Sequence, residues 1–345
     1  MNLPQLRLLR KGTVFLNEGQ RKGINSQGSK NAKIAIVGDT TDAYDMNAMK
    51  PFSGFGGNAL ESCLHAAGII RGECYLTNLV KVKGLEKEYF EERKGLFTAK
   101  GITTVNALKE ELAETKANII VTCGAMPFAA LCNHKYLGKY RGYIFPSTLL
   151  PGRKVIPTFH PRYSLRGMYI QKYIISSDFR KAKEESEFPN IHRPERELFY
   201  SPESVREVLD WCHYYTKQTK VGFDLEVVNY EVSCLSFAST PEIAHVLPIA
   251  GRWNEEEEMQ VWHGIQEVLG NPDSIKVVQN GMFDIPFLLR HCNIEVRGPV
   301  HDTMVAHSIL YPDLPKSLGF LGSIYCGSQE YWKDLVSFTN IKEEA

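Results

Sequence analysis

Phe223-Asp224-Leu225-Glu226, read together with Asn280-Gly281-Met282-Phe283-Asp284, decides how this chain is interpreted. The first stretch is an apolar strand with carboxylates at positions i and i+2, and side chains at that spacing leave the same face of a strand. The second stretch places an Asn and an Asp four residues apart, which is one face of a helix if the segment is helical. Both stretches therefore present grouped oxygen ligands.

Carboxylate and amide oxygens of this kind suit Mg²⁺ or Mn²⁺. Asp224, Glu226 and Asp284 are the candidate metal ligands, and three acids converging on two such ions would support in-line attack on a phosphodiester. The residues alone therefore indicate a metal-dependent phosphodiesterase centre in the second half of the chain.

The bulk composition limits the class of protein. With 345 residues and 43% hydrophobic content, the chain can form two domains with real cores. No apolar run is long enough to span a bilayer, and the N-terminus lacks the pattern of a signal peptide. The eight cysteines are scattered without a Cys-x-x-Cys pair, which favours reduced thiols in a cytoplasmic setting and argues against zinc or an iron–sulfur cluster.

The charge is unevenly distributed although the net charge is zero. Residues 1–188 carry 28 lysines and arginines against 17 acids, whereas residues 189–345 carry 12 against 23. A basic half joined to an acidic half suggests nucleic-acid contact by the first and metal binding by the second. Uneven surface charge without function is the alternative.

The first half alternates between strand and helix patterns. This alternation predicts a three-layer α/β domain with a mainly parallel sheet over residues 32–183, preceded by a flexible arm at 1–31. The predicted strands cover residues 32–37, 74–82, 118–123 and 155–159, and the predicted helices include 58–67 and 105–114.

The second half has a different order. Residues 184–200 are polar and contain proline, which predicts a linker, and Ser201-Pro202-Glu203 has the composition of a helix start. The order β-β-β-α-β-α over 201–345 is the one that a ribonuclease-H-like mixed sheet requires. Its predicted strands are 221–227, 232–239, 244–249 and 275–279, and its predicted helices are 255–269, 280–291 and one that Asp302 caps.

FDLE (223–226), NGMFD (280–284) and HDTMVAHSILYPDLPKSLGFL (301–321) together resemble the 3′–5′ exonuclease domain of family-A DNA polymerases, particularly phage enzymes. The resemblance implies that Asp224 and Glu226 are metal ligands of the first motif. It makes Asp284 the acid of the second motif, beside a second Mg²⁺ or Mn²⁺, and places Asn280 near the scissile nucleotide.

The chain departs from that family at the third motif, Tyr-x-x-x-Asp. The nearest candidate, Tyr331-Trp332-Lys333-Asp334, has a spacing of three instead of four. We therefore expect a C-terminally incomplete site and no polymerase region. The chain would be the front of a longer polymerase, or one piece of a split polymerase whose partner polypeptide supplies the missing motif.

The first half resembles the uracil-DNA glycosylase superfamily, closest to its bacterial and archaeal iron–sulfur branch. The motifs that carry this resemblance are IAIVGDTTDAYD (34–45), KPFSGFGGNAL (50–60), GIIRGECYLTNLVKVK (68–83), NIIVTCGAMPFAAL (118–131) and PTFHPRYSLR (157–166). The resemblance implies a base-flipping site. Its residues would be Phe52 as the stacking ring, Asn78 as the base reader, His160 for the uracil carbonyl, Asp39 for water, and Arg162 and Arg166 for phosphate.

Two departures make uracil excision the weaker expectation. Thr41-Asp42 stands where the family has Pro-Gly, and the four cluster cysteines are absent, with Val82 at one of their positions. The first domain is therefore interpreted either as a glycosylase or as a DNA-binding or purely structural remnant.

The predicted function is proofreading during DNA replication, by a metal-dependent 3′–5′ exonuclease module fused to a glycosylase-like DNA-binding module. A non-catalytic DNA-binding accessory or split-polymerase subunit is one alternative, and an RNA 3′-trimming exonuclease is another. The expected partners are single-stranded 3′ ends and primer–template DNA rather than a membrane, in the host cytoplasm if a phage encodes the chain.

Overall fold

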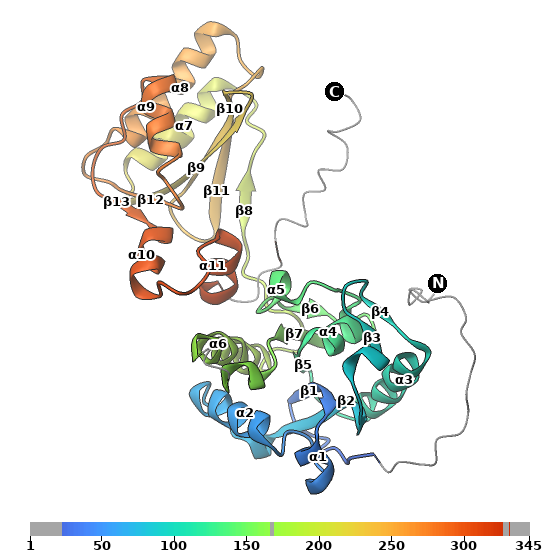
Figure 1. Ribbon diagram of the computed structural model, residues 1–345. Coiled ribbons are helices and arrows are strands. Elements are labelled where there is room, and N and C mark those ends of the chain that lie inside the picture. Colours follow the sequence, from blue (N-terminus) through green and yellow to red (C-terminus); the bar gives the residue numbers. More distant parts are fainter. Residues whose placement is uncertain (1–22, 166–168, 327–330, 332–345) are drawn as a thin grey trace. The chain divides into compact units, whose positions relative to one another are not determined.

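The computed structural model describes residues 23–165, 169–326 and 331. It divides into two compact units (Figure 1). Of the described residues, unit 1 comprises those up to Arg193 together with those from Gly319 onward, and unit 2 comprises Pro194–Leu318. Within the described ranges, no helix has both the length and the apolar character needed to cross a membrane.

Unit 1 is built on a five-stranded sheet with the strand order β2-β1-β5-β7-β6. The first four strands run parallel, and β6 is antiparallel to β7. The strands are β1 (Ile34–Thr41), β2 (Cys74–Lys83), β5 (Ile119–Cys123), β6 (Phe145–Pro146) and β7 (Lys154–Thr158). The predicted mainly parallel sheet is confirmed.

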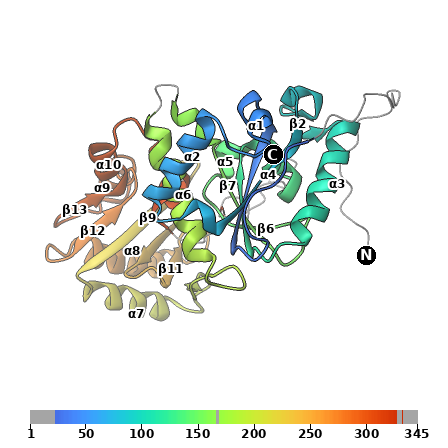
Figure 2. The same ribbon diagram turned by 90° about the horizontal axis from the view of Figure 1, so that it is seen from below.

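Helices cover both faces of this sheet (Figure 2). One buried cluster joins the sheet to α2 (Phe55–Ala66) and α6 (Tyr169–Glu185). The other joins it to α3 (Ala99–Ala113), α4 (Ala125–Cys132) and the hairpin of β3 (Phe90–Glu91) and β4 (Leu96–Phe97). Two apolar layers around one sheet give the three-layer domain that the alternation of strands and helices predicts.

Shorter elements of unit 1 lie in its connections. They are α1 (Ala43–Ala48), α5 (Leu137–Tyr140), and the 3₁₀ turns η1 (Arg71–Glu73), η2 (Glu86–Glu88) and η3 (Pro161–Leu165). Asp42 caps α1, because its carboxylate accepts a hydrogen bond from the Asp45 N–H at 2.9 Å. Since α1 and η3 directly follow the ends of parallel strands, they place polar side chains at the edge where such sheets bind ligands.

Unit 2 has a six-stranded mixed sheet with the order β13-β12-β9-β10-β11-β8. Strand β10 is antiparallel to its neighbours β9 and β11, and β12 and β13 continue the sheet in parallel beside β9. The strands are β8 (Glu197–Phe199), β9 (Lys220–Val228), β10 (Glu231–Ala238), β11 (Ile243–Pro248), β12 (Ile275–Val278) and β13 (Val300–Asp302). This is the predicted ribonuclease-H-like sheet, extended by the edge strand β8.

The core of unit 2 lies on one face of β9. Phe223 and Leu225 are buried there against α7 (Val205–Thr216), α8 (Glu255–Leu269) and α9 (Asp284–Cys292). The last helix of the unit is α10 (Thr303–Leu310). Period-2 burial along β9 leaves its even-numbered acids on the other face.

The segment 184–200, expected as a linker, contains the boundary between the units at Arg193–Pro194 and also β8, which pairs with β11. Two local predictions were wrong. The cap of α7 is Ser204, not Ser201, and its hydroxyl accepts from the Glu207 N–H at 3.4 Å. Residues 280–283 form a turn rather than the first turn of a helix, and α9 begins only at Asp284.

Candidate active sites

The two acids of β9 in unit 2 share one face of the strand. Asp224 and Glu226 are exposed, whereas Phe223 and Leu225 between and beside them are buried, as the i, i+2 spacing predicts. Partial burial raises the pKa of Asp224, with the Leu225 N–H acting in the opposite direction. The strand therefore presents two carboxylates on one face, of which Asp224 is partly desolvated.

Asp284 joins this pair from α9, of which it is the first residue. It is 6% exposed, and its carboxylate interacts with the N–H of Leu225, the residue between the two strand acids. Burial is the largest cause that raises the pKa of Asp284, followed by the negative charge of Asp224, with Glu226 adding to it. Asp284 is thus close enough to Asp224 and Glu226 for their negative charges to raise its pKa.

Asn280 is held in a different way from that expected. Its φ is +62°, in the left-handed region, so it does not share a helix face with Asp284. The Asp302 carboxylate accepts hydrogen bonds from the N–H groups of Asn280 (3.1 Å), Gly281 (2.9 Å) and Met304 (2.8 Å). Asp302 is therefore the cap of α10, as predicted, and it also fixes the turn that leads to Asp284.

The acids of unit 2 fit a hard divalent cation in their chemistry. All three donors are carboxylate oxygens, and mutual repulsion at close range is what a bound cation would relieve. Within the described residues, however, no three His, Cys, Asp or Glu side chains stand in an arrangement that could hold a metal ion. Tyr331 packs in unit 1, and the rest of the Tyr331–Asp334 stretch lies outside the described residues.

Unit 1 brings most of the predicted base-flipping residues around one small cavity. This cavity has a volume of about 40 Å³, which is room for a water or two and not for a pyrimidine. Its lining includes Phe52, Asn78, His160 and Arg162. A base could therefore enter only if this site opens.

Asn78 is engaged inside this cavity by groups that the sequence did not suggest. Its amide nitrogen donates to the carboxylate of Asp45 at 3.3 Å and to the hydroxyl of Thr41 at 3.4 Å. Asp45 also accepts from the N–H of Ser53 at 2.7 Å, and burial raises the pKa of Asp45. Asp45 is thus a site residue that sequence reasoning missed; its position in the IAIVGDTTDAYD motif was the available signal.

Phe52 and His160 form the other wall of the cavity. The Phe52 ring stacks on the His160 imidazole with 5.7 Å between centroids, and Phe52 has a φ of +52°. Two glycines leave room for the Phe52 ring and the Asn78 amide, because neither carries a Cβ. A Cβ at Gly38 would come 2.4 Å from Asn78 Oδ1, and a Cβ at Gly57 would come 1.8 Å from the Phe52 carbonyl oxygen.

The imidazole of His160 is held neutral. Burial and the nearby charge of Arg162 lower the pKa of His160 to about 3. Its Nδ1 accepts a hydrogen bond from the Arg162 N–H at 3.3 Å, so that the proton of the neutral ring lies on Nε2, which is then a donor. A neutral donor of this kind suits contact with a carbonyl oxygen.

Asp39 faces a second, larger space. This cavity of about 770 Å³ is lined by Asp39, Glu86, Glu92, Gly124 and a wall from α5. Asp39 Oδ2 accepts from the Arg162 guanidinium at 3.4 Å, while its buried Oδ1 has no hydrogen-bond partner. Burial, with the charge of Glu86, raises the pKa of Asp39 well above its usual value.

Arg162 links the two spaces, because it lines the small cavity and also contacts Asp39. Asp39 is absent from the lining of the small cavity, so the structure brings four of the predicted residues together and places the fifth beside them. Arg166, the remaining predicted phosphate contact, lies outside the described residues.

We expect Gly38→Ala to destabilise unit 1 by about 1–3 kcal/mol, because its methyl group must displace the Asn78 amide and the Phe52 ring. Gly72→Ala is the matched control, since a Cβ there meets nothing within 4 Å. Urea denaturation of the two variants measures the difference. Equal stability of the two proteins would show that Asn78 and Phe52 do not pack against Gly38 as described.

Comparison with known proteins assigns each unit. The family model of the uracil DNA glycosylase superfamily matches residues 26–180, and the model of a 3′-5′ exonuclease matches residues 202–339. A type-4 uracil-DNA glycosylase of Thermotoga maritima is 30% identical over 164 residues, which are 46% of this chain and 79% of that protein.

One relative spans both units. The DNA polymerase of Bacillus phage SP01 is 23% identical over 335 residues, covering 86% of this chain. This chain covers only 34% of the length of that polymerase. Among solved structures, RNase D of Escherichia coli matches with a TM-score of 0.32 and 13% identity, over 42% of this chain and 37% of that chain.

Proposed function

Since this chain belongs to the uracil DNA glycosylase superfamily through its first unit and carries a 3′–5′ exonuclease domain in its second, we propose that it serves proofreading in DNA replication. The exonuclease-like unit would remove 3′ nucleotides, and the glycosylase-like unit would hold DNA. The relation to a phage DNA polymerase over most of the chain supports DNA as the substrate.

The observation that carries this proposal is the grouping of acids on β9. Asp224 and Glu226 leave one face of the strand, and Asp284 reaches the Leu225 N–H between them. Families of this kind use divalent metal ions, and we infer Mg²⁺ or Mn²⁺ from the all-oxygen donor set. Bound there, such ions would activate water and neutralise charge on the phosphodiester.

Each site residue of unit 2 would then have its own role in the reaction. Asp224, Glu226 and Asp284 would hold the ions. Asn280 would contact the terminal nucleotide from the turn that Asp302 fixes, because that turn directly precedes Asp284. A polymerase polypeptide that supplies a Tyr-x-x-x-Asp motif is the proposed partner, and the eight free cysteines are compatible with a reducing host cytoplasm.

The substrate is tested with 5′-labelled single-stranded DNA and RNA of the same sequence, each incubated with the chain and Mn²⁺. Shortening of the DNA with little change of the RNA supports proofreading, whereas faster shortening of RNA supports 3′ trimming of RNA. Binding of either strand without shortening supports the accessory function. Chelation of the metal should stop every shortening reaction.

Uracil excision is the second candidate function, and the neutral His160 favours it. A buried imidazole that donates through Nε2 stabilises negative charge on a leaving pyrimidine without being titrated. Asp39, beside Arg162, would position the attacking water, and Asn78 would read the base edge once Asp45 releases its amide. An abasic product from a uracil-containing oligonucleotide is the direct test.

The pH dependence of that excision follows from the same pKa shifts. Asp39 must be ionised to position water, and burial raises its pKa, so the rate should fall on acidification beginning above the usual pH range of an aspartate. His160 adds no inflection between pH 5 and 9, because its pKa is about 3. Asp39→Asn should abolish the excision activity, because the amide cannot become a carboxylate that positions water. An excision rate that falls with rising pH would contradict the role assigned to Asp39.

A further inference from the structure

The chain returns to unit 1 after completing unit 2. Helix α11 (Leu318–Tyr325) lies within the stretch that matches the exonuclease family model, yet the described residues from Gly319 onward pack in unit 1. Tyr331 also packs in unit 1, since its ring makes edge contacts with the rings of Tyr140 and Tyr143, at centroid distances of 5.7 and 5.5 Å.

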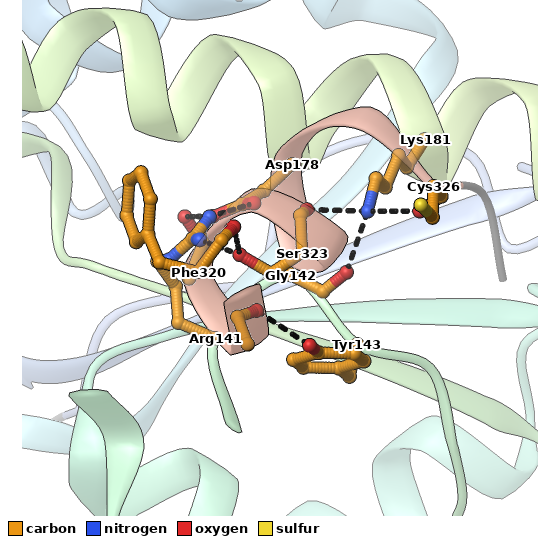
Figure 3. Close-up of polar contacts among 10 residues, drawn as sticks. Arg141, Gly142, Tyr143, Asp178, Lys181, Phe320, Ser323 and Cys326 are labelled. Atoms are coloured by element: carbon orange, nitrogen blue, oxygen red, sulfur yellow. Dashed lines mark hydrogen bonds and ion pairs between the residues drawn. The ribbon is translucent and has the colours of Figure 1, made fainter. Parts of the chain in front are cut away.

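Unit 1 offers the segment a charged site that is almost fully buried, formed by Arg141, Asp178 and Lys181 (Figure 3). Arg141 follows α5, and the other two residues lie one turn apart on α6. The Arg141 guanidinium donates to Asp178 at 2.7 Å, and the Thr158 hydroxyl donates to the second oxygen of that carboxylate at 2.7 Å. Buried charges of this kind need further partners.

Helix α11 supplies those partners. Arg141 donates to the Ser323 hydroxyl, and its guanidinium lies over the Phe320 ring at 5.0 Å. Lys181 donates to the carbonyl oxygens of Ser323 and of Cys326 (3.0 Å), as well as to that of Gly142 (3.1 Å). The last carbonyls of a helix lack partners within it, so the ammonium group both satisfies them and favours the helix dipole.

The other end of the helix is also bound. The Tyr143 hydroxyl donates to the Gly319 carbonyl at 2.6 Å, so that unit 1 holds α11 at its first and last turns. Close approach is possible because small residues line the contact. A Cβ at Gly142, where φ is +77°, would come 2.6 Å from Asp178 Oδ1 and 3.0 Å from the Ser323 carbonyl oxygen.

We propose that Gly319–Cys326, together with Tyr331, forms a docking segment that completes the glycosylase-like unit, with the Arg141–Asp178–Lys181 site as its receptor. Unit 2 is consequently joined to unit 1 at both of its ends, by Arg193–Pro194 and by this segment. The segment also reaches the wall of the large cavity, because the Lys139 ammonium lies over both the Tyr140 and the Tyr331 ring. The exonuclease family match therefore includes residues that serve the other unit.

The test replaces Lys181 by Met in the full chain, which removes the ammonium group and retains most of the apolar stem. Lys183→Met is the matched control, since Lys183 lies on the same helix, is exposed, and donates to the Gly68 carbonyl. Maleimide labelling of Cys326, followed by mass spectrometry, reports opening of the segment, and Cys292 in unit 2 serves as the internal reference.

We expect Lys181→Met to accelerate labelling of Cys326 about tenfold relative to Cys292, and Lys183→Met to leave it unchanged. Labelling of buried Cys63 would reveal unfolding of unit 1 in either variant. If Lys181→Met unfolds, Ser323→Ala is the deciding variant, because it removes only the hydroxyl that Arg141 binds. Unchanged Cys326 labelling in the folded variant, or equal acceleration by Lys183→Met, would overturn the proposal.

Discussion

Asp224→Ala should reduce the metal-dependent shortening of single-stranded DNA about 100-fold or more. The physical reason is that Asp224 stands on the exposed face of β9 beside Glu226 and near Asp284, so its loss removes a ligand and weakens charge neutralisation at the phosphodiester. The measurement is the initial rate of product formation from a 5′-labelled oligonucleotide in Mn²⁺. DNA affinity measured without metal should stay within about twofold.

Asp273→Ala is the matched control for this variant. Asp273 is an exposed aspartate of the same unit, in the loop before β12, and the same substitution there should leave the rate unchanged. Equal inertness of the parent chain and Asp224→Ala, with salt-sensitive binding retained, would support the accessory function instead. Addition of a polypeptide with the missing motif would then separate the two alternatives: activity restored to the parent and not to Asp224→Ala would indicate a split-polymerase subunit, whereas continued inertness of both would indicate a non-catalytic accessory.

Asp178→Ala should lower the free energy of unfolding of unit 1 by about 3–5 kcal/mol, which corresponds to about 6–20 °C in melting temperature. Asp178 and Arg141 are 0% and 2% exposed, and the guanidinium would remain buried without its carboxylate. Thr158 would lose its acceptor as well. Calorimetry of the full chain, with the transition of unit 1 resolved, measures the change.

An exposed ion pair provides the contrast to this buried pair. Glu114 pairs with Lys30 at 2.5 Å, but both side chains are more than half exposed, so Glu114→Ala should leave the melting temperature unchanged. The double variant Arg141→Met, Asp178→Leu should recover part of the stability, because it removes the buried charge along with its partner. A double variant less stable than Asp178→Ala would contradict this explanation.

Much of the fold could be predicted because its signals are local. The alternation along Phe223–Glu226 fixes which side chains face the core, and the structure buries Phe223 and Leu225 as that pattern requires. The strands of both sheets and the helix Glu255–Leu269 follow from runs of apolar residues with period 2 or 3.6. The spacing of apolar residues within one segment decides which of its faces is buried, so the sequence of that segment is enough to predict its secondary structure.

The candidate sites were less predictable where a distant residue decides the local conformation. Asn280 adopts a positive φ because the Asp302 carboxylate, 22 residues later, binds its N–H, and this prevents the helix that the Asn-x-x-x-Asp spacing predicted. The amide of Asn78 on β2 is engaged by Asp45, which lies on α1, 33 residues earlier in the chain. Such contacts depend on which loops meet at a sheet edge.

The sequence by itself determined the two fold classes, the face of β9 that carries Asp224 and Glu226, and the residue types at both sites. Only the tertiary structure decided that Asp284 reaches the Leu225 N–H, and that Asp39 faces a different cavity from His160. It also decided that Gly319–Cys326 belongs to unit 1, where the buried Lys181 of α6 donates to the Cys326 carbonyl oxygen that follows α11. Periodicity records the face that each segment buries, whereas the partner that covers it is selected by packing and by the pairing of buried charges.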